Sequence, residues 1–485
     1  MRWKTWTIRK RSTTTPKCQN RLVKNLESIF LENKTNSRPA TNNLTNNLTN
    51  VLVIGGGGRE HALAWKLAQS HKVQKVYVAP GNGGTALDPR LENINITDPQ
   101  ALLDWVITQN IALTVVGPEQ PLAAGVVDLF RAKGLRIFGP TAAAAQLESS
   151  KAFSKAFMQR HGIPTAVYET FSDAAKAHVY VDKMGAPIVV KADGLAAGKG
   201  VVVAMTLKEA HDAIDFMLLG NELGVAHNGG EARVVIEEFL SGEEASFIVM
   251  CDGKNVVTMA TSQDHKRLLD GDAGPNTGGM GAYSPAPVVT PDVHARAMRE
   301  VILPTIKGMA KDGIAFTGFL YAGLMIDADK KIKTLEFNCR MGDPETQPIM
   351  MRLKTDLFDV LWAATEPTEQ GGLQDIELEW DRRTALGVVM AAQGYPAAPR
   401  KGDVITGLPV LKQADYEQEQ DAMVFHAGTM DKDGNTLTSG GRVLCVTVLS
   451  DSVKKAQQRA YELTKSIHFD GAQYREDIGY KAIKS

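Results

Sequence analysis

The sequence predicts a multidomain fold of mixed α/β and α+β class, with an N-terminal parallel-sheet domain, an α+β region and a small C-terminal domain. Three observations predict it. The chain has 485 residues, enough for about three domains. Short apolar strand signals alternate with helical patterns up to residue 150, as in βαβ units. Beyond residue 151, strand-rich and helical stretches are mixed, which is typical of an α+β domain.

Composition excludes several classes of protein. Hydrophobic residues make up 44% of the chain and charged residues 22%, ordinary values for a globular protein and not those of a disordered, collagen-like or coiled-coil chain. No apolar run approaches the roughly 18 residues of a membrane span. The four cysteines are widely separated, so we expect neither a disulfide framework nor a structural zinc site. We therefore expect the protein to work in a reducing, cytoplasmic setting.

The first fifty residues differ from the rest of the chain. Residues 1–50 carry 10 basic and 2 acidic residues, which leaves 44 basic and 53 acidic residues for the remainder. The acidic remainder gives no electrostatic reason to bind nucleic acid. The polar, low-complexity tract predicts a disordered or non-native extension. Its basic, hydroxyl-rich composition leaves organelle targeting open as an alternative.

Residues 51–150 are predicted to form the N-terminal α/β domain. Strands are expected at 51–54, 75–78, 113–116 and 136–138, with helices at 60–70 and through 126–130. The glycine-rich breaks follow strands, and ligands of open α/β sheets bind at the carboxyl ends of the strands. We therefore expect 56–61, 81–84 and 118–119 to face one crevice.

The next region is predicted to be rich in hairpins. Strands at 188–191 and 201–205 flank a glycine-rich loop, and Thr206 with Glu209 forms a capping-box pattern for a helix that runs to residue 219. Further strands are expected at 233–237, 246–251, 319–326 and 333–337. Residues 262–287 read as a long loop, which in a compact domain is usually functional. A third unit begins after Trp380, with strands at 384–390 and 442–448.

The glycine-rich loops do not match the common nucleotide motifs. The run from Gly55 to Glu60 lacks the third glycine of the dinucleotide fingerprint, and no acid follows the second strand. It can bind a phosphate at a helix N-terminus, or be a tight turn without a ligand. The loop 194–200 has the wrong spacing for a P-loop and Gly200 where Ser or Thr would hold magnesium. It can fold over phosphates as a lid, or be a solvated hairpin tip.

Polar residues cluster at the end of the strand at 333–337. Glu336 and Asn338 share one face of that strand by its two-residue period. Two oxygen ligands suit Mg²⁺, although a polar, solvated strand face would show the same pattern. An arginine and two acids follow directly, at Arg340, Asp343 and Glu345. The stretches 264–267 and 276–281 offer donors for an anionic ligand.

Five motifs together resemble the phosphoribosylamine–glycine ligase family over nearly all of residues 51–485. They are the segments 57–62, 191–200, 263–267, 274–284 and 336–347. The resemblance implies the ATP-grasp fold. It places an N-terminal domain at 51–150, the ATP-grasp region at 151–375 with a lid at about 170–240, and a C-terminal domain at 376–485. It also implies a monomer or weak dimer without nucleic-acid or membrane partners.

The resemblance assigns a role to individual positions. It implies ATP binding by Lys151, Lys191, Gly194, Gly198, Gly200, Glu237, Glu238, Phe239, Leu240 and Glu244. It implies metal binding by Glu336 and Asn338, and catalytic roles for Lys199, Arg340, Asp343 and Glu345. Substrate-binding positions are Gly57, Gly58, Arg59, Glu60, His61, Gly81, Asn82, Pro118, Glu119, Asp264, Lys266, Arg267, Asn276, Thr277, Gly278 and Gly279.

The implied reaction joins glycine to 5-phosphoribosylamine at the expense of ATP, through glycyl phosphate, with Mg²⁺ or Mn²⁺. The reaction belongs to purine biosynthesis, and another ATP-grasp carboxylate–amine ligase of that pathway is the alternative. Many ATP-grasp enzymes supply a further acid about twelve residues before the Glu-x-Asn pair. Here that region is Leu324-Met-Ile326, so phosphates and water would have to complete the shell of any second metal.

Overall fold

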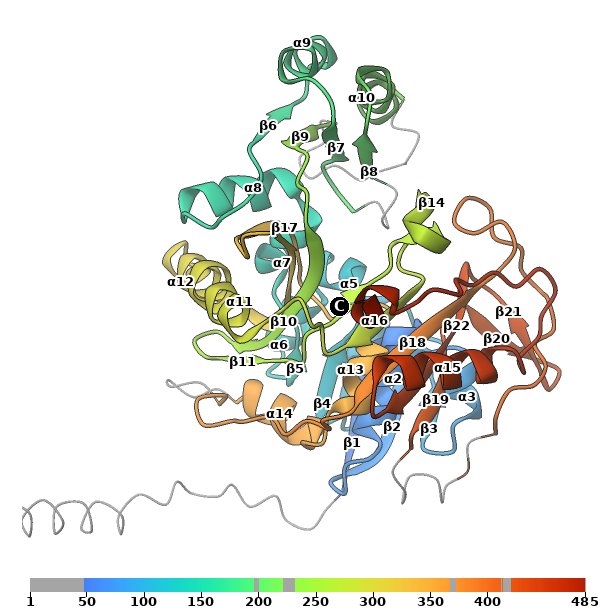
Figure 1. The fold of residues 1–485 in the computed structure, drawn as a ribbon. Coiled ribbons are helices and arrows are strands. Elements are labelled where there is room, and N and C mark those ends of the chain that lie inside the picture. The colour runs from blue at the N-terminus through green and yellow to red at the C-terminus, as the bar shows by residue number, and fades with distance from the viewer. Residues whose placement is uncertain are drawn as a thin grey trace, which may run out of the picture. The chain divides into compact units, whose positions relative to one another are not determined.

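Figure 1 shows the computed structural model, which describes residues 48–195, 200–220, 232–366, 372–410, 412 and 420–484. The prediction of an N-terminal extension therefore lies almost wholly outside the described residues. None of the described helices has the length and apolar character needed to cross a membrane. The three described cysteines, Cys251, Cys339 and Cys445, are free and buried.

The first sheet is parallel, with strand order β3-β2-β1-β4-β5. Its strands are β1 (Thr49–Gly55), β2 (Val73–Pro80), β3 (Leu91–Asn93), β4 (Leu113–Val116) and β5 (Ile137–Phe138). Four of them confirm the predicted strands, and β3 was not predicted. The strand order reverses between β1 and β4, and in open α/β sheets ligands bind at the carboxyl ends of the strands at such a point.

Helices connect the strands of this sheet. They are α2 (Gly58–Leu67), α3 (Gly83–Leu87), α4 (Pro99–Thr108), α5 (Glu119–Ala123), α6 (Val126–Arg131) and α7 (Ala142–Ser149). Helices α2, α3 and α5 each begin within three residues of the end of a strand. Their N-termini therefore lie at the carboxyl edge of the sheet, where backbone N–H groups favour anions.

A second, antiparallel sheet with order β6-β9-β7-β8 forms the unit that we call the lid. It contains β6 (Tyr168–Phe171), β7 (Ile188–Ala192), β8 (Val201–Ala204), β9 (Val234–Glu238), α9 (Ala174–Met184), α10 (Leu207–Ile214) and the π-helical turn η1 (Asp215–Leu219). The predicted hairpin is β7–β8, and the predicted capping box of Thr206 and Glu209 begins α10. The lid has a hydrophobic cluster composed of its own residues.

The central sheet is antiparallel, with order β11-β10-β16-β17. Its strands are β10 (Glu243–Asp252), β11 (Val256–Thr258), β16 (Thr317–Ile326) and β17 (Ile332–Asn338), and its helices include α8 (Lys151–Arg160), α11 (Pro291–Arg296), η3 (Ala297–Ile302) and α12 (Leu303–Lys311). Phe319 of β16 contacts Phe138 of β5 edge-to-face, with ring centroids 4.9 Å apart. The first sheet thus packs against the central one.

The fourth sheet has the order β12-β15-β18-β22-β19. It joins β12 (Gln263–Asp264) and β15 (Gly281–Ser284) to β18 (Thr384–Ala391), β22 (Arg442–Ser450) and β19 (Ala422–His426). The expectation of one long loop at 262–287 is wrong, because β15 pairs with β18 over four residues. The same stretch contains the hairpin of β13 (Arg267–Leu269) and β14 (Ala273–Asn276), joined by η2 (Asp270–Asp272).

The remaining elements surround the fourth sheet. They are α13 (Thr346–Arg352), α14 (Leu357–Ala364), the hairpin of β20 (Thr429–Lys432) and β21 (Asn435–Thr438), α15 (Val453–Thr464) and α16 (Tyr480–Lys484). Arg475, just before α16, is fully buried and forms ion pairs with Asp272 at 2.8 Å and Asp477 at 2.7 Å. These bonds fasten the C-terminal segment to the β13–β14 hairpin.

Candidate functional site

The crevice of the first sheet is built by close contact between two loops. A Cβ atom at Gly56 would lie 2.5 Å from the carbonyl oxygen of Gly81, so the loop after β1 needs glycine there. Asn82 donates to the Gly56 carbonyl at 3.0 Å and to the His426 carbonyl at 2.8 Å. Its side-chain oxygen Oδ1 caps α3 by accepting from the N–H groups of Gly84 and Thr85. Asn82 thus holds the two loops together beside β19.

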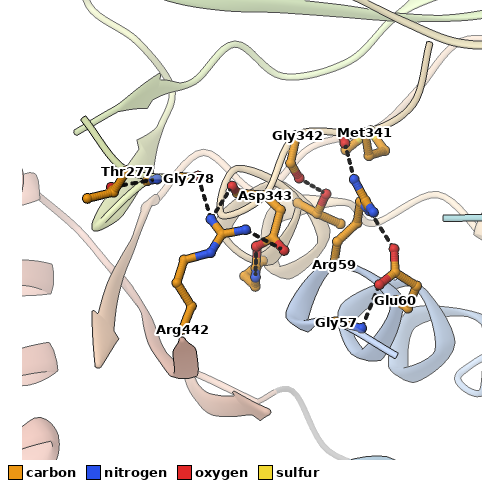
Figure 2. A network of polar contacts seen from close by, with 12 residues as sticks. Gly57, Arg59, Glu60, Thr277, Gly278, Met341, Gly342, Asp343 and Arg442 are labelled. Carbon is orange, nitrogen blue, oxygen red and sulfur yellow. Dashed lines mark hydrogen bonds and ion pairs between the residues drawn. The ribbon is translucent and has the colours of Figure 1, made fainter. Parts of the chain in front are cut away.

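The N-terminus of α2 carries a network that reaches across the molecule (Figure 2). The buried Glu60 carboxylate accepts from the Gly57 N–H at 2.7 Å and pairs with Arg59. Arg59 also donates to the Met341 carbonyl at 3.3 Å and lies 3.9 Å from Glu119, the first residue of α5. Arg59 therefore links the crevice to the turn after β17.

His61 is buried and neutral. Its Nδ1 accepts from the His426 N–H at 2.9 Å, which leaves the proton on Nε2. That Nε2 is buried without a hydrogen-bond partner among the described residues. Burial, together with the nearby His426, lowers the pKa of His61 to about 3. A buried imidazole of this kind remains uncharged at neutral pH, and its Nε2–H is able to donate a hydrogen bond to a ligand oxygen.

The turn after β17 centres on Arg340. Its guanidinium lies 2.9 Å from Glu148 and 3.3 Å from Glu119, and donates to the Asn338 side chain at 3.3 Å. Burial opposes the charge on Arg340, but Glu148 and Glu119 more than offset this and raise its pKa. Two carboxylates thus hold one arginine fixed between the first sheet and the central sheet.

The two acids of this turn have different partners. Asp343 pairs with Arg442 at 3.1 Å and accepts from Gln347 at 3.0 Å. Burial would raise the pKa of Asp343, but Arg442 and Arg59 lower it. Glu345 accepts from the Ser246 hydroxyl at 2.9 Å. Asp343 is therefore held as a carboxylate, while Glu345 faces the central sheet.

Arg442 connects the turn to the stretch at 276–279. It donates to the carbonyls of Gly278 and Asp343, both at 2.5 Å (Figure 2). Thr277 donates from its hydroxyl to the Lys266 carbonyl at 2.9 Å and accepts from the Gly279 N–H at 3.0 Å. The loop is thus fixed by a residue of β22, a strand of the fourth sheet.

A buried acidic group lies next to this loop. Asp264 has one carboxyl oxygen without a hydrogen-bond partner among the described residues. Burial and the charge of Glu345 raise the pKa of Asp264 well above its usual value, against the opposing charge of Lys266. A site of this kind favours a cation. Lys266 forms an ion pair with Glu244, which raises the pKa of the lysine despite its burial.

Three lysines and an arginine surround the carboxylate of Glu336. Burial would raise the pKa of Glu336, but Lys266, Lys191, Lys151 and Arg340 lower it to about 2. No described residue donates a hydrogen bond to this carboxylate. Glu336 is therefore ionised, with its oxygens available for a further ligand.

Glu237 organises two of the buried lysines. Its carboxylate lies 3.0 Å from Lys191 and 2.9 Å from Lys155. Burial lowers the pKa of Lys155 to about 8, although Glu237 opposes this shift. Lys151 donates to the Gly194 carbonyl at 3.0 Å. These contacts tie α8 and β7 to β9.

The loop between β7 and β8 is described only at its ends. Gly194 and Gly200 are described, whereas the predicted residues Gly198 and Lys199 lie outside the described residues. The Ala192 N–H donates to the Gly200 carbonyl at 2.8 Å. Asp193 accepts from the Ser150 hydroxyl at 3.0 Å and pairs with Arg233 at 2.7 Å. The base of the loop is therefore anchored to the start of α8.

The remaining predicted residues lie around this centre. Glu238 pairs with Lys333 and accepts from the Val167 N–H at 2.9 Å. Phe239 is 39% exposed, and Leu240 is half-buried. Arg267 donates to the Gly274 carbonyl at 2.6 Å and pairs with Asn276 across the β13–β14 hairpin. Gly58 packs close to Gln347, and Pro118 immediately precedes α5.

The residues present fit a magnesium ion. Glu336 and Asn338 occupy alternate positions on β17, opposite Gly323 and Tyr321 of β16. A carboxylate and an amide oxygen are the hard ligands that Mg²⁺ prefers, with water and phosphates completing its shell. The described residues contain no group of three or more His, Cys, Asp or Glu side chains that could hold a metal ion. A magnesium ion here would therefore depend on a phosphate ligand.

Several residues of the site were missed from the sequence. They are Glu148, Lys155, Asp193, Arg233, Ser246, Tyr321 and Arg442. Lys155 follows Lys151 by four residues, and this spacing places both on one face of α8, so a signal for it was present. Tyr321 lies 2.9 Å from the Ser246 hydroxyl. No local signal distinguishes Arg442 or Glu148 from ordinary surface residues.

Comparison with known proteins identifies relatives over nearly the whole described chain. Three family models match: the phosphoribosylglycinamide synthetase N domain at residues 49–148, its ATP-grasp (A) domain at 149–346 and its C domain at 385–481. A phosphoribosylamine–glycine ligase of Ralstonia nicotianae is 72% identical over 434 residues, which are 90% of this chain and 99% of the relative. One of Escherichia coli O157:H7 is 61% identical over 437 residues, 90% of this chain and 99% of that one.

Solved structures agree with these relatives. The crystal structure of phosphoribosylamine–glycine ligase from Thermotoga maritima has a TM-score of 0.75 at 34% identity, covering 89% of this chain and 100% of that one. A biotin carboxylase from Campylobacter jejuni has a TM-score of 0.65 at 13% identity, covering 90% of this chain and 96% of that one. At that identity the likeness shows only the fold.

Proposed function

The chain belongs to the phosphoribosylglycinamide synthetase family, and we propose that it joins glycine to 5-phosphoribosylamine with cleavage of ATP to ADP and phosphate. The family relationship supports the reaction. The observation that carries the proposal is the meeting of three segments around Arg340 and Glu336. These are the crevice of the first sheet, the end of β17 and the lysines beside the lid.

ATP is proposed to bind between the lid and the central sheet. Lys151 and Lys191 flank Glu336 and supply positive charge for phosphate oxygens. Within the segment from Glu237 to Leu240, the residues of β9 already pair with β6 and β7. The backbone groups of Phe239 and Leu240, which lead on to β10, are therefore those proposed to recognise an adenine ring. Glu336 and Asn338 would hold Mg²⁺, which neutralises phosphate charge when it is bound. The loop at 194–200 would cover the phosphates.

Glycine is proposed to bind between Arg340 and Asp264. Burial and the neighbouring Glu345 raise the pKa of Asp264, and an ammonium group would relieve the repulsion between these two acids. Arg340 is a fixed cation that can orient a carboxylate. These two groups would direct the amino end of glycine away from ATP and its carboxylate toward the phosphates.

The phosphoribosylamine is proposed to bind in the crevice of the first sheet. The N-terminus of α2 at Gly57 and Gly58 offers backbone N–H groups for the 5-phosphate. Arg59 links this crevice to the turn that carries Arg340. The two substrates would thus approach one another across the turn at 340–347.

The chemistry explains why such a site must close. A carboxylate does not react with an amine at neutral pH, because its leaving group would be oxide. The glycine carboxylate attacks the γ-phosphate, so that a new O–P bond forms as ADP leaves. The amine then attacks the acyl carbon and expels phosphate. Water would hydrolyse the acyl phosphate, and the separate hydrophobic core of the lid supports its movement as a unit.

The test supplies the purified chain with ATP, Mg²⁺ and phosphoribosylamine, together with glycine, formate or bicarbonate. We expect ADP release only with glycine, and the mass of glycinamide ribonucleotide in the product. Hydroxylamine in place of phosphoribosylamine should yield glycine hydroxamate, which reports the acyl phosphate. ADP release that does not depend on glycine would contradict the proposal and favour another ATP-grasp ligase.

A further inference from the structure

The lid contains a histidine pair that the proposed reaction does not use. His178 lies on α9 and His211 on α10, and their Nδ1 atoms are 2.7 Å apart. The ring centroids are 4.8 Å apart. The side chains are 28% and 30% exposed, so solvent ions can reach them. This pair joins the two helices of the lid.

Each histidine is oriented by an aspartate from the other side of the pair, His211 by Asp182 of α9 and His178 by Asp215, the first residue of η1 directly after α10. His178 Nε2 lies 2.9 Å from Asp215, and His211 Nε2 lies 3.0 Å from Asp182. Each aspartate follows the other histidine of the pair by four residues, so the arrangement is reciprocal. A carboxylate at Nε2 fixes the proton there, and leaves Nδ1 with its lone pair as the free nitrogen.

Two nitrogen lone pairs repel one another at 2.7 Å unless a proton or a metal ion lies between them. A single shared proton meets this need in the metal-free protein. Histidines that bind metals typically donate their other ring N–H to a carboxylate, and both members of this pair do so. Their Nδ1 atoms contact each other between α9 and α10.

We propose that His178 and His211 form a binding site on the lid for a late first-row transition-metal dication, distinct from the magnesium site at Glu336. The metal replaces the shared proton. Two metal–nitrogen bonds form, one N–H bond breaks, and one proton is released to solvent. Water completes the metal's shell, because no further protein ligand is present among the described residues.

The spacing of the nitrogens indicates which metal fits. Imidazole nitrogens bind such ions at about 2.0–2.1 Å, so two ligands at a right angle are separated by about 2.9 Å and tetrahedral ligands by about 3.4 Å. The observed 2.7 Å is nearer to the right-angle geometry. Ni²⁺ and Cu²⁺ favour that geometry and bind nitrogen ligands well. We therefore expect Ni²⁺ to bind more tightly than Mn²⁺ or Mg²⁺, and at least as tightly as Zn²⁺.

The experiment titrates Ni²⁺ into the full chain, purified without a polyhistidine tag and kept in excess Mg²⁺ to limit binding of Ni²⁺ at Glu336. Calorimetry in two buffers with different ionisation enthalpies counts the protons released. We expect one Ni²⁺ per chain at this site and about one proton released per Ni²⁺. H178A and H211A should each abolish this binding event.

Further variants separate this site from other histidines. Replacing both Asp182 and Asp215 by alanine should weaken Ni²⁺ binding by roughly 10–100-fold, while H71A, at an exposed histidine outside the lid, should leave it unchanged. Glycine-dependent ADP release by every variant checks that the lid is folded. Wild-type protein that binds no more Ni²⁺ than H178A would overturn the proposal, and so would binding without proton release.

Discussion

Arg442 on β22 lies 3.1 Å from Asp343, in the turn that follows β17. The two residues are 99 positions apart in sequence, and only Arg442 belongs to a strand. Through this contact the fourth sheet fixes the position of the turn at 340–347, and through Gly278 it fixes the neighbouring loop. The site therefore depends on a residue that is proposed to contact neither ATP nor glycine.

Replacing Arg442 by glutamine should lower kcat/KM for glycine by about 100-fold, because a shift of the turn of about 1 Å has that effect. The pKa of Asp343 should rise when the arginine that lowers it is removed. The acid limb of the pH–rate profile should then move to higher pH. Arg382→Gln, at an exposed arginine, is the matched control. Wild-type kinetics in the Arg442 variant would show that the ion pair has no role in positioning.

Removing the charge of Glu336 should stop turnover. The carboxylate is held ionised by Lys266, Lys191, Lys151 and Arg340, and these cations would remain without it. We expect Glu336→Gln to lower kcat by roughly 10²–10³-fold, the range seen for loss of one electrostatic group in an active site. Removal of Mg²⁺ with EDTA should have a similar effect on the wild type.

The matched control is Glu462→Gln, an exposed glutamate on α15. ADP release and thermal unfolding should both be measured. A Glu336 variant that unfolds at the wild-type temperature and still turns over at the wild-type rate would remove this residue from the site.

Stability should fall at acid pH in part through His265. Its Nδ1 donates to the Gly281 carbonyl at 3.2 Å, and its Nε2 accepts from the Gly479 N–H at 3.2 Å. Burial, with Arg475 and Lys481 nearby, lowers the pKa of His265 to about 4. The unfolded chain, with a pKa near 6.5, then binds more protons than the folded chain, so this contribution is present above pH 6.5 and lost as pH falls toward 4.

The contribution is at most about 3 kcal/mol. His265→Gln, which does not titrate, should make the urea midpoint less sensitive to pH between 7 and 5. His71→Gln should leave the pH dependence as in the wild type. An equally steep pH dependence in the His265 variant would assign the effect to other groups, such as His61 and His426.

The C-terminal segment should stabilise the β13–β14 hairpin through Arg475. Arg475→Met would leave Asp272 and Asp477 without their shared partner, at a loss of roughly 3 kcal/mol in stability. Because the hairpin follows Lys266 directly, we also expect a higher KM for glycine with a smaller change in kcat. Arg459→Met on the exposed face of α15 is the control. A lower unfolding temperature without a change in KM would limit Arg475 to a structural role.

Local signals predicted much of this fold. The strand at 113–116 has the predicted bounds, and the capping box of Thr206 and Glu209 begins α10. Each of these depends on residues close together in the chain. The resemblance to a family identified the loops that lie around Glu336, because the family's motifs are long enough to be specific.

Long-range pairing could not be predicted in the same way. The residues of β15 look like a loop, since their strand partner β18 lies about a hundred positions further on and the stretch is rich in glycine. The role of Arg442 could not be predicted from the sequence either, because an arginine at the start of a strand is usually a surface residue. Lys155 could have been predicted from the sequence, since its four-residue spacing from Lys151 puts both on the same face of α8.

The pairing of β15 with β18 also bears on how the polypeptide could be divided. A fragment that began at residue 376 would carry β18 with an open edge, and such an edge readily recruits foreign strands. A fragment that ended at residue 375 would keep β15 paired with β12 on one side but without β18 on the other. Division of the chain between these halves would therefore be expected to yield two fragments that aggregate. An intact reading frame thus protects against aggregation as well as against loss of activity.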